Sequence, residues 1–243
     1  MTHGDADIAH VAAAIGEPAR GRMLMALLDG RALPASVLAR EAGVAPSTAS
    51  GHLDRLLAAG LLAVEPSGRH RYYRLAGAEV AAALESLARL APGAPVRSLR
   101  QSTQAEALRH ARTCYDHIAG RLGVEIMASL IDRGCLAGGD GRHDPARARR
   151  DRYSAPGTDI AYTLTPAGER CLQGFGVELA GQSGVRYCVD WTEQRHHLGG
   201  RLGALLMQRL LALDWVRRAP AGRALLITPA GRRGLEETFG ARP

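Results

Sequence analysis

Apolar positions recur with the period of an amphipathic helix through the first 90 residues. Ile8, Val11 and Ile15 fall on one helical face, and a second apolar run follows Pro18, which is a common first residue of a helix. Gly30 comes directly after that run and is typical of a helix end. The same pattern continues further along, and the helices that it predicts span 8–15, 18–30, 34–42, 46–59 and 77–91.

Two short apolar runs between the last two of these helices have the pattern of β-strands. They cover 61–64 and 71–75, and the Ser67-Gly68 pair between them favours a hairpin turn. Residues 34–75 thus combine a helix, a tight turn at 43–45, a second helix and a two-stranded ribbon, which is the order of a winged helix-turn-helix. The predicted fold class is mainly α with short β-hairpins.

A segment rich in Pro and Gly, 92–95, cannot continue a helix and predicts a domain boundary. We expect a DNA-binding and dimerisation domain over 1–91, a linker over 92–102 and a sensor domain over 103–243.

The second domain contains a weak internal repeat. Residues 117–123 resemble 197–203, and 164–168 resemble 227–231. Each copy predicts a long helix, two short strands and a closing helix, an α-β-β-α unit, over about 103–180 and 185–240. The Thr-Pro pair in each copy predicts a Thr N-cap at the closing helix. The insertion 137–157, rich in Gly, Arg and Asp, is expected to form a mobile surface loop.

Composition narrows the class of protein. Hydrophobic residues make up 46% and charged residues 23%, which excludes disordered and collagen-like chains. No window has the roughly 18 apolar residues of a membrane span, and Met1–Ile15 lacks the features of a signal peptide. The four cysteines form no CxxC pair, which argues against a disulfide framework or a zinc knuckle, so we expect a reducing cytoplasm and no membrane partner.

Charge favours a polyanionic partner without deciding the matter. The net charge is +7, and all 31 basic residues are Arg. A chain that uses Arg alone and is rich in Ala and Gly is also what a GC-rich genome produces. The basic composition therefore supports nucleic-acid binding only together with a suitable surface.

The second helix of the helix-turn-helix presents such a surface. Its short polar side chains suit base edges in the major groove, and Arg55 lies one turn further along, within reach of a phosphate. The ribbon tip adds a cationic cluster for the neighbouring backbone or minor groove. The alternative is a solvated polar face. The predicted DNA-contacting residues are Ser47, Thr48, Ser50, His52, Arg55, Arg69, His70 and Arg71.

About residues 8–90 resemble the ArsR/SmtB family of bacterial repressors. The resemblance rests on Ser50-Gly51-His52-Leu53, on Gly60-Leu61-Leu62 and on Gly68-Arg69-His70-Arg71-Tyr72-Tyr73-Arg74-Leu75. It implies a cytoplasmic homodimer, paired through its first and last helices, that binds an imperfect palindrome of double-stranded DNA and releases it when an inducer arrives.

This chain departs from the family pattern in two ways. Gly51 replaces a longer side chain in the recognition helix, at a cost of roughly 1 kcal/mol in helix propensity. The metal-thiolate sequence of the third helix is absent from Val37-Leu38-Ala39-Arg40, and the closing helix 77–91 lacks the Asp and His ligands of zinc-sensing members. The usual family positions are therefore not expected to hold a metal.

Candidate ligands for a metal or haem lie in the second half instead. His110, Cys114 and His117 have the spacing of one helical stripe. Cys188 and His197, with His196 beside them, could complete a site if the two halves pack face to face. Imidazole and thiolate are ligands for zinc, copper, nickel and haem iron.

Three other interpretations of these residues stay open. Arg121 shares the stripe, so the row can be a structural polar edge of a packing seam. Cys114 and Cys188 can form a thiol-based redox switch. A small organic effector can bind between the two repeat units, near Tyr115, Asp116 and Trp191. No cofactor is expected to be required for DNA binding itself.

Catalytic motifs are not evident in the sequence. It contains no P-loop, HExxH or GxSxG motif and no GxGxxG after a strand, so we do not expect an enzyme. A protein-interaction or scaffold module is the alternative, which would explain the amphipathic helices but not the cationic ribbon tip. The favoured function is a homodimeric repressor whose operator binding is modulated by an effector in the C-terminal domain. The operator, the effector and the sign of regulation stay open.

Overall fold

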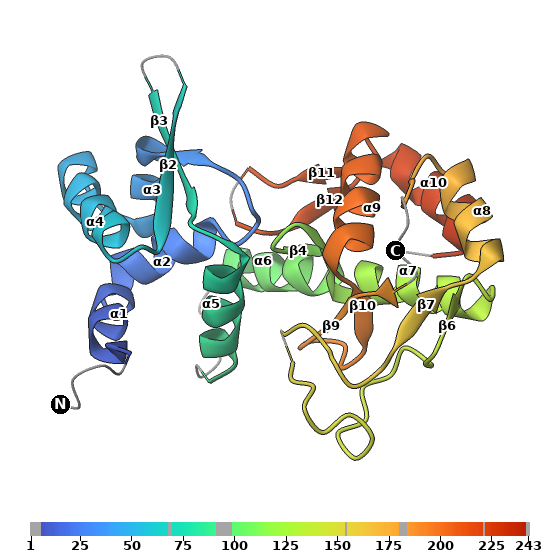
Figure 1. Cartoon of the computed structure of the whole chain (residues 1–243). Helices are drawn as coiled ribbons and strands as arrows, with labels where there is room; N and C mark the ends of the chain where they lie inside the picture. The colour runs from blue at the N-terminus through green and yellow to red at the C-terminus, as the bar shows by residue number, and fades with distance from the viewer. Residues whose placement is uncertain are drawn as a thin grey trace. The chain divides into compact units, whose positions relative to one another are not determined.

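The computed structural model describes residues 6–67, 70–90, 99–153, 155–179, 184–220 and 222–241. Internal contacts divide the chain into two compact units, 1–84 and 85–243 (Figure 1). The predicted linker, 92–102, falls mostly outside the described residues, and its last residues begin a helix. Of the helices in the described ranges, none is long and apolar enough to cross a membrane.

The helices of unit 1 bury one apolar face each. Leu24, Leu38 and Leu53 are completely buried, and they lie on three helices that pack on one another. Gly43 has a positive φ of 69° and ends the third helix, so the fourth begins three residues later, as predicted. The helices are α1 (Ile8–Ile15), α2 (Pro18–Ala26), α3 (Ala35–Ala42), α4 (Pro46–Ala58) and α5 (Ala78–Leu90), the last of which continues into unit 2.

The unit 1 sheet has three antiparallel strands in the order β1-β3-β2, which are β1 (Leu33–Pro34), β2 (Leu62–Ser67) and β3 (His70–Leu75). β2 and β3 form the predicted ribbon, which Figure 1 shows as a long projecting hairpin. It is longer than predicted, because Pro66 pairs with Arg71 and Ser67 with His70. β1 was not predicted. Leu33 and Pro34 pair with Tyr73 and Tyr72, so Pro34 precedes the third helix instead of beginning it.

In the described residues of unit 2, the strands form three two-stranded hairpins, β4–β5, β9–β10 and β11–β12, and a sheet in the order β6-β7-β8. Its helices are α6 (Leu99–His110), α7 (Gly120–Asp132), α8 (Pro166–Gly174), α9 (Gly200–Ala212) and α10 (Pro229–Phe239). Its strands are β4 (Arg112–Cys114), β5 (His117–Ala119), β6 (Leu136–Ala137), β7 (Tyr162–Leu164), β8 (Gly184–Val185), β9 (Tyr187–Val189), β10 (His196–Leu198), β11 (Val216–Arg218) and β12 (Leu225–Ile227).

The helix predicted through residues 110–122 was wrong. The hairpin β4–β5 separates α6 from α7, and its turn contains Tyr115 with a φ of 55°, a conformation that no helix accepts. All six residues of the two strands are buried, so they show no alternation of polar and apolar positions. A strand of three buried residues cannot be distinguished from a helical segment by periodicity.

The same order of elements follows the hairpins β4–β5 and β9–β10. α7 is followed by β6, β7 and α8, and α9 is followed by β11, β12 and α10. Thr165 and Thr228 cap α8 and α10 by accepting hydrogen bonds from Gly168 N and Gly231 N, which confirms the predicted N-caps. That the two segments are repeats of one unit stays a prediction.

The insertion predicted as a mobile loop is anchored. In its described part, Asp151 is buried and accepts hydrogen bonds from Thr158 N and Asp159 N. Residues 153 and 156 form isolated bridges to β9. Polar composition indicated a solvated segment, but buried hydrogen bonds hold the loop against the hairpin.

Candidate functional sites

The predicted recognition helix, α4, turns an apolar face inward and a polar face outward. Ala49, Leu53 and Leu56 are completely buried, and this spacing of four and three residues fixes the rotation of the helix about its axis. The outward side then carries small polar groups and one guanidinium. The exposed members of the predicted set on this helix are Ser47, Thr48, Ser50 and Arg55.

His52 does not belong to this outward face. Its side chain is only 14% exposed, and its Nδ1 lies 3.6 Å from Oε2 of Glu17, at the start of α2. Glu17 also caps α2 by accepting a hydrogen bond from Arg20 N. A role for His52 in positioning α4 against α2 therefore fits the contacts better than base recognition. Asp54 is exposed on the same helix and was not considered in the sequence interpretation.

Of the predicted residues at the ribbon tip, Arg69 and the side chain of His70 lie outside the described part. Arg71 is exposed, and its guanidinium lies 5.6 Å from the centre of the Tyr73 ring. Stacking on an aromatic ring limits the side chain's freedom while leaving the cation accessible. Arg74, on the same strand, forms an ion pair with Glu65.

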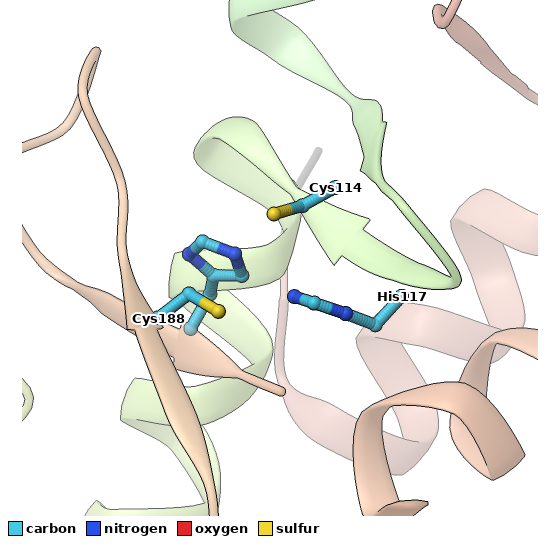
Figure 2. Close-up of side chains that lie close together, drawn as sticks. Cys114, His117 and Cys188 are labelled. Atoms are coloured by element: carbon cyan, nitrogen blue, oxygen red, sulfur yellow. The ribbon is translucent and has the colours of Figure 1, made fainter. Parts of the chain in front are cut away.

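Four predicted ligand residues meet in unit 2 although they are far apart in the sequence. Cys114, His117, Cys188 and His197 each offer one ligand atom, and these atoms all lie within 4.8 Å of one another. All four side chains are buried, and Figure 2 shows Cys114, His117 and Cys188 pointing toward one another. We call this set the Cys-His cluster.

Two hairpins supply the cluster in matching ways. Cys114 lies directly opposite His117 in β4–β5, and Cys188 lies directly opposite His197 in β9–β10. β5 contacts β10, and each hairpin also packs on the helix that follows the other, since α7 contacts β10 and α9 contacts β5. A β-carbon on Gly203 would lie only 2.9 Å from Cβ of His117, so this close approach depends on glycine.

The histidines of the cluster have carboxylates on one side. Nδ1 of His117 lies 2.9 Å from Oδ1 of Asp116, and Nδ1 of His197 lies 3.8 Å from Oδ2 of Asp190. Nε2 of His117 and both ring nitrogens of His197 are buried, and no described residue forms a hydrogen bond with them. Burial lowers the pKa of His197, which favours its neutral form.

Asp190 anchors the second hairpin in the interior. It accepts hydrogen bonds from Nη2 of Arg112 at 2.8 Å and from Gly120 N at 2.7 Å, and its other oxygen accepts from Thr192 N at 2.8 Å. Burial raises the pKa of Asp190, but the charge of Arg112 and the hydrogen bonds from Thr192 and Gly120 outweigh it, so the pKa stays well below the usual range. Asp190 is therefore a fully buried carboxylate that links β4, the start of α7 and the residues after β9.

Comparison with known proteins agrees with the fold of unit 1 and extends along the chain. A helix-turn-helix domain family matches residues 15–65. The chain is 37% identical over 236 residues to the uncharacterized HTH-type transcriptional regulator YdfF of Bacillus subtilis, covering 95% of this chain and 96% of that protein. The chain belongs to the ArsR/SmtB-like family of HTH-type transcriptional regulators. It is therefore a DNA-binding transcriptional regulator.

Two further matches each cover about a third of the chain. The HTH-type transcriptional regulator CmtR of Mycobacterium bovis is 39% identical over 80 residues, 33% of this chain and 67% of that protein. The NMR structure of the homodimeric winged helix-turn-helix domain of Mb0332 from Mycobacterium bovis is 28% identical with a TM-score of 0.31, and covers 37% of this chain and 88% of that one.

The remaining predicted effector and ligand residues of this ArsR/SmtB-like chain are not part of the Cys-His cluster. His110 ends α6 and is half-buried. Asp116 contacts His117, and Trp191 is exposed beneath the guanidinium of Arg112, 5.1 Å from the ring centre. Tyr115 is in the turn of β4–β5. The predicted helical stripe placed His110 with Cys114, and the hairpin separates them.

Sequence interpretation missed a second polar cluster on the other side of β10. His143, Asp151 and His196 offer ligand atoms within 4.8 Å of one another. Tyr187 donates a hydrogen bond to Asp151, and the hydroxyl of Tyr162 lies 2.8 Å from Nδ1 of His196. Successive residues of a strand point to opposite faces, which explains why His196 and His197 belong to different clusters. The adjacent His-His pair was the available signal.

Proposed function

We propose that this regulator is a homodimeric repressor that inserts α4 into the major groove of a double-stranded operator. The observation that supports this best is the division of α4 into a completely buried apolar side and an outward side of Ser47, Thr48 and Ser50. Small polar side chains let a helix approach base edges closely and offer donors and acceptors to them. Sequence preference would come from this face.

Arginines supply the affinity in this proposal. Arg55 on α4 and Arg71 on the ribbon are exposed, and each neutralises one phosphate. Each contact releases condensed counterions, so the binding constant falls with salt concentration. The expected loss for Arg55→Ala or Arg71→Ala is about one unit in the slope of log K against log salt concentration, equally on all DNA sequences.

The test is a salt titration of binding to the chain's own upstream DNA, measured by fluorescence anisotropy. Arg217→Ala is the matched control, since it removes an exposed arginine of unit 2 that pairs with Asp214. Ser50→Ala should change sequence preference while leaving the salt slope unchanged. Unchanged slopes in the Arg55 and Arg71 variants would refute this binding face, and no binding at all by the wild type would favour a scaffold function.

Exposed apolar side chains on α1 and α5 support a dimer. Ile8 on α1 is 75% exposed and Leu90 on α5 is 83% exposed, and Val11 and Leu87 on the same two helices are exposed as well. Large apolar groups at helical spacing in water favour burial against a partner. A second copy of the chain is the occupant that we propose, and it would place two α4 helices on one palindromic site.

Sedimentation velocity of the full-length chain tests the dimer. Leu90→Glu should convert it to a monomer and weaken operator binding, because a charge would be buried in the interface. Leu226→Glu is the control, since Leu226 is an exposed apolar residue of unit 2 on β12. A wild-type monomer at micromolar concentration, or a Leu90→Glu variant that stays dimeric, would contradict the proposal.

The C-terminal unit is the part that we propose to sense an effector. Unit 2 spans 85–243, far more than a helix-turn-helix requires, and it contains the buried polar clusters described above. An effector bound there would change operator affinity only through differential binding to the DNA-bound and free states. Operator titrations with and without a candidate effector measure that coupling directly.

A further inference from the structure

We propose that Cys114, His117, Cys188 and His197 bind one Zn²⁺ ion in a closed, four-coordinate site within unit 2. The inference rests on the geometry of unit 2 and does not depend on how the chain binds DNA. It assigns a ligand class to a set of buried residues that no DNA contact explains.

The donor atoms are close enough for a single ion. Typical zinc bonds of about 2.3 Å to sulfur and about 2.0–2.1 Å to nitrogen put tetrahedral ligand atoms roughly 3.3–3.8 Å apart. The four donor atoms here lie within 4.8 Å of one another. Small rotations of the four side chains would therefore complete the coordination, with no rearrangement of the two hairpins.

Unpartnered buried nitrogens give independent support. Nε2 of His117 and both ring nitrogens of His197 are buried with no hydrogen-bond partner among the described residues. Buried polar atoms without a partner are rare in native proteins, because each costs about 1–3 kcal/mol. A metal bond to one nitrogen of each ring removes that cost at the centre of the cluster.

A carboxylate lies beside each imidazole, as is common for histidines that bind a metal. Asp116 lies 2.9 Å from Nδ1 of His117, which leaves Nε2 for the ion. Asp190 lies 3.8 Å from Nδ1 of His197, too far for a hydrogen bond, and supplies only a negative charge on that side of the ring. A carboxylate that accepts the second N–H fixes the tautomer and the ring orientation, and it increases the basicity of the ligating nitrogen.

The charges and protons balance in this assignment. Both cysteines are free thiols, so binding of Zn²⁺ converts two S–H groups to thiolates and releases their two protons, together with any proton carried by a ligating imidazole nitrogen. The two thiolates neutralise the ion, which leaves a neutral site in the interior. The Cys114 thiol lies 3.4 Å from Oε2 of Glu85, and Arg223 lies 3.1 Å from Oε1 of that carboxylate. Loss of the thiol proton removes the hydrogen bond from Cys114 to Glu85, and the Glu85 carboxylate stays paired with Arg223.

Zinc fits the donor set, and cations that prefer oxygen ligands do not. Two sulfurs and two imidazoles exclude Mg²⁺ and Ca²⁺, which need oxygen ligands. Four protein ligands in a buried position leave no open coordination site for a substrate, which is typical of structural zinc. A disulfide between Cys114 and Cys188 would leave the convergence of both histidines unexplained.

The second polar cluster does not support a metal to the same degree. The oxygens of Asp151 already accept hydrogen bonds from Thr158 N, Asp159 N and the hydroxyl of Tyr187. His196 has a partner for one ring nitrogen in Tyr162. This cluster is a hydrogen-bond network that holds the 138–161 segment to β9 and β10.

The first experiment measures zinc binding by the full-length chain in a reducing buffer. Metal-free protein is titrated with ZnCl₂ in competition with a chromophoric chelator, and we expect one equivalent per chain. Loss of a residue that only supports a metal ligand lowers metal affinity by up to about 100-fold. The double variant Cys114→Ser/Cys188→Ser removes two ligands, so its zinc affinity should fall by more than that. Cys135→Ser is the matched control, because Cys135 is equally buried but lies outside the cluster, and it should bind zinc as the wild type does.

The second experiment needs no variant and remains decisive if the double variant does not fold. X-ray absorption of the zinc-loaded wild type should show two sulfur and two nitrogen neighbours, and native mass spectrometry should show one zinc ion per chain. A shell of oxygen and nitrogen alone would overturn the proposal. So would less than about 0.1 equivalent of zinc at micromolar free metal, or a double variant that retains zinc.

Discussion

The buried carboxylate of Asp190 allows a quantitative test of what holds unit 2 together. Asp190→Asn keeps the size and shape of the side chain but removes its charge. Asp190 is completely buried, and both of its oxygens accept hydrogen bonds from N–H groups, those of Arg112 and Gly120 on one oxygen and that of Thr192 on the other. An asparagine amide has only one acceptor oxygen, so its NH₂ group must face a donor wherever it rotates.

The expected cost follows from that geometry. Arg112 is itself buried, so removing its partner leaves an uncompensated charge in the interior. Breaking such a pair costs about 3–5 kcal/mol, whereas its formation adds much less net stability. With a urea dependence of about 2 kcal/mol per molar, the unfolding midpoint of unit 2 should fall by roughly 1.5–2.5 M.

Tryptophan fluorescence makes the measurement specific for unit 2. The chain has two tryptophans, Trp191 and Trp215, and both belong to unit 2. Urea unfolding is followed in metal-free buffer. Asp214→Asn is the control, because this aspartate is 54% exposed and pairs with an exposed arginine, so its loss should change the stability by less than about 1 kcal/mol. A midpoint for Asp190→Asn within about 0.3 M of the control would refute the reasoning.

Three further substitutions test local structure, two in unit 2 and one in unit 1. Gly203→Ala should cost about 1–3 kcal/mol in the same assay, because a β-carbon would lie 2.6 Å from Leu198 O and 2.9 Å from Cβ of His117. Gly51→Ala, where a β-carbon meets nothing within 4 Å, should instead raise the melting temperature of unit 1 in circular dichroism, and a decrease there would contradict the helix-propensity argument. Thr228→Ala removes the cap of α10 and should cost about 1 kcal/mol by tryptophan fluorescence, and an unchanged midpoint would show that the cap adds no stability.

The elements of unit 1 could be predicted closely because local signals determine them. Gly43 and Pro46 mark the turn and the start of α4, and the apolar residues that follow have one clear period. The ends of β2 and β3 were less certain, because Pro66 and Ser67 have low strand propensity and are in the ribbon only through pairing with β3. His52 shows the limit of a helical wheel, since a contact with Glu17, distant in the sequence, covers a side chain predicted to face outward.

The short strands of unit 2 and the packing between its hairpins could not be predicted from the sequence pattern. Strands of three buried residues, such as β4 and β5, have no readable period, and a helix was predicted in their place. The residue types of the Cys-His cluster were recognised, but the helical stripe that connected His110 to Cys114 was wrong. The closeness of Cys114 and Cys188 depends on tertiary packing between two hairpins, which the similarity of 117–123 to 197–203 only suggested.

The segment of β4–β5 and α7 and the segment of β9–β10 and α9 each pack on part of the other. α7 packs on β10 as well as on its own β5, and α9 packs on β5, so part of the apolar surface of each segment is buried only by the other. We therefore expect the two segments to complete their folding together. Because one polypeptide holds both sides of the contact, each side accumulates substitutions separately, a freedom that two symmetry-related subunits do not have.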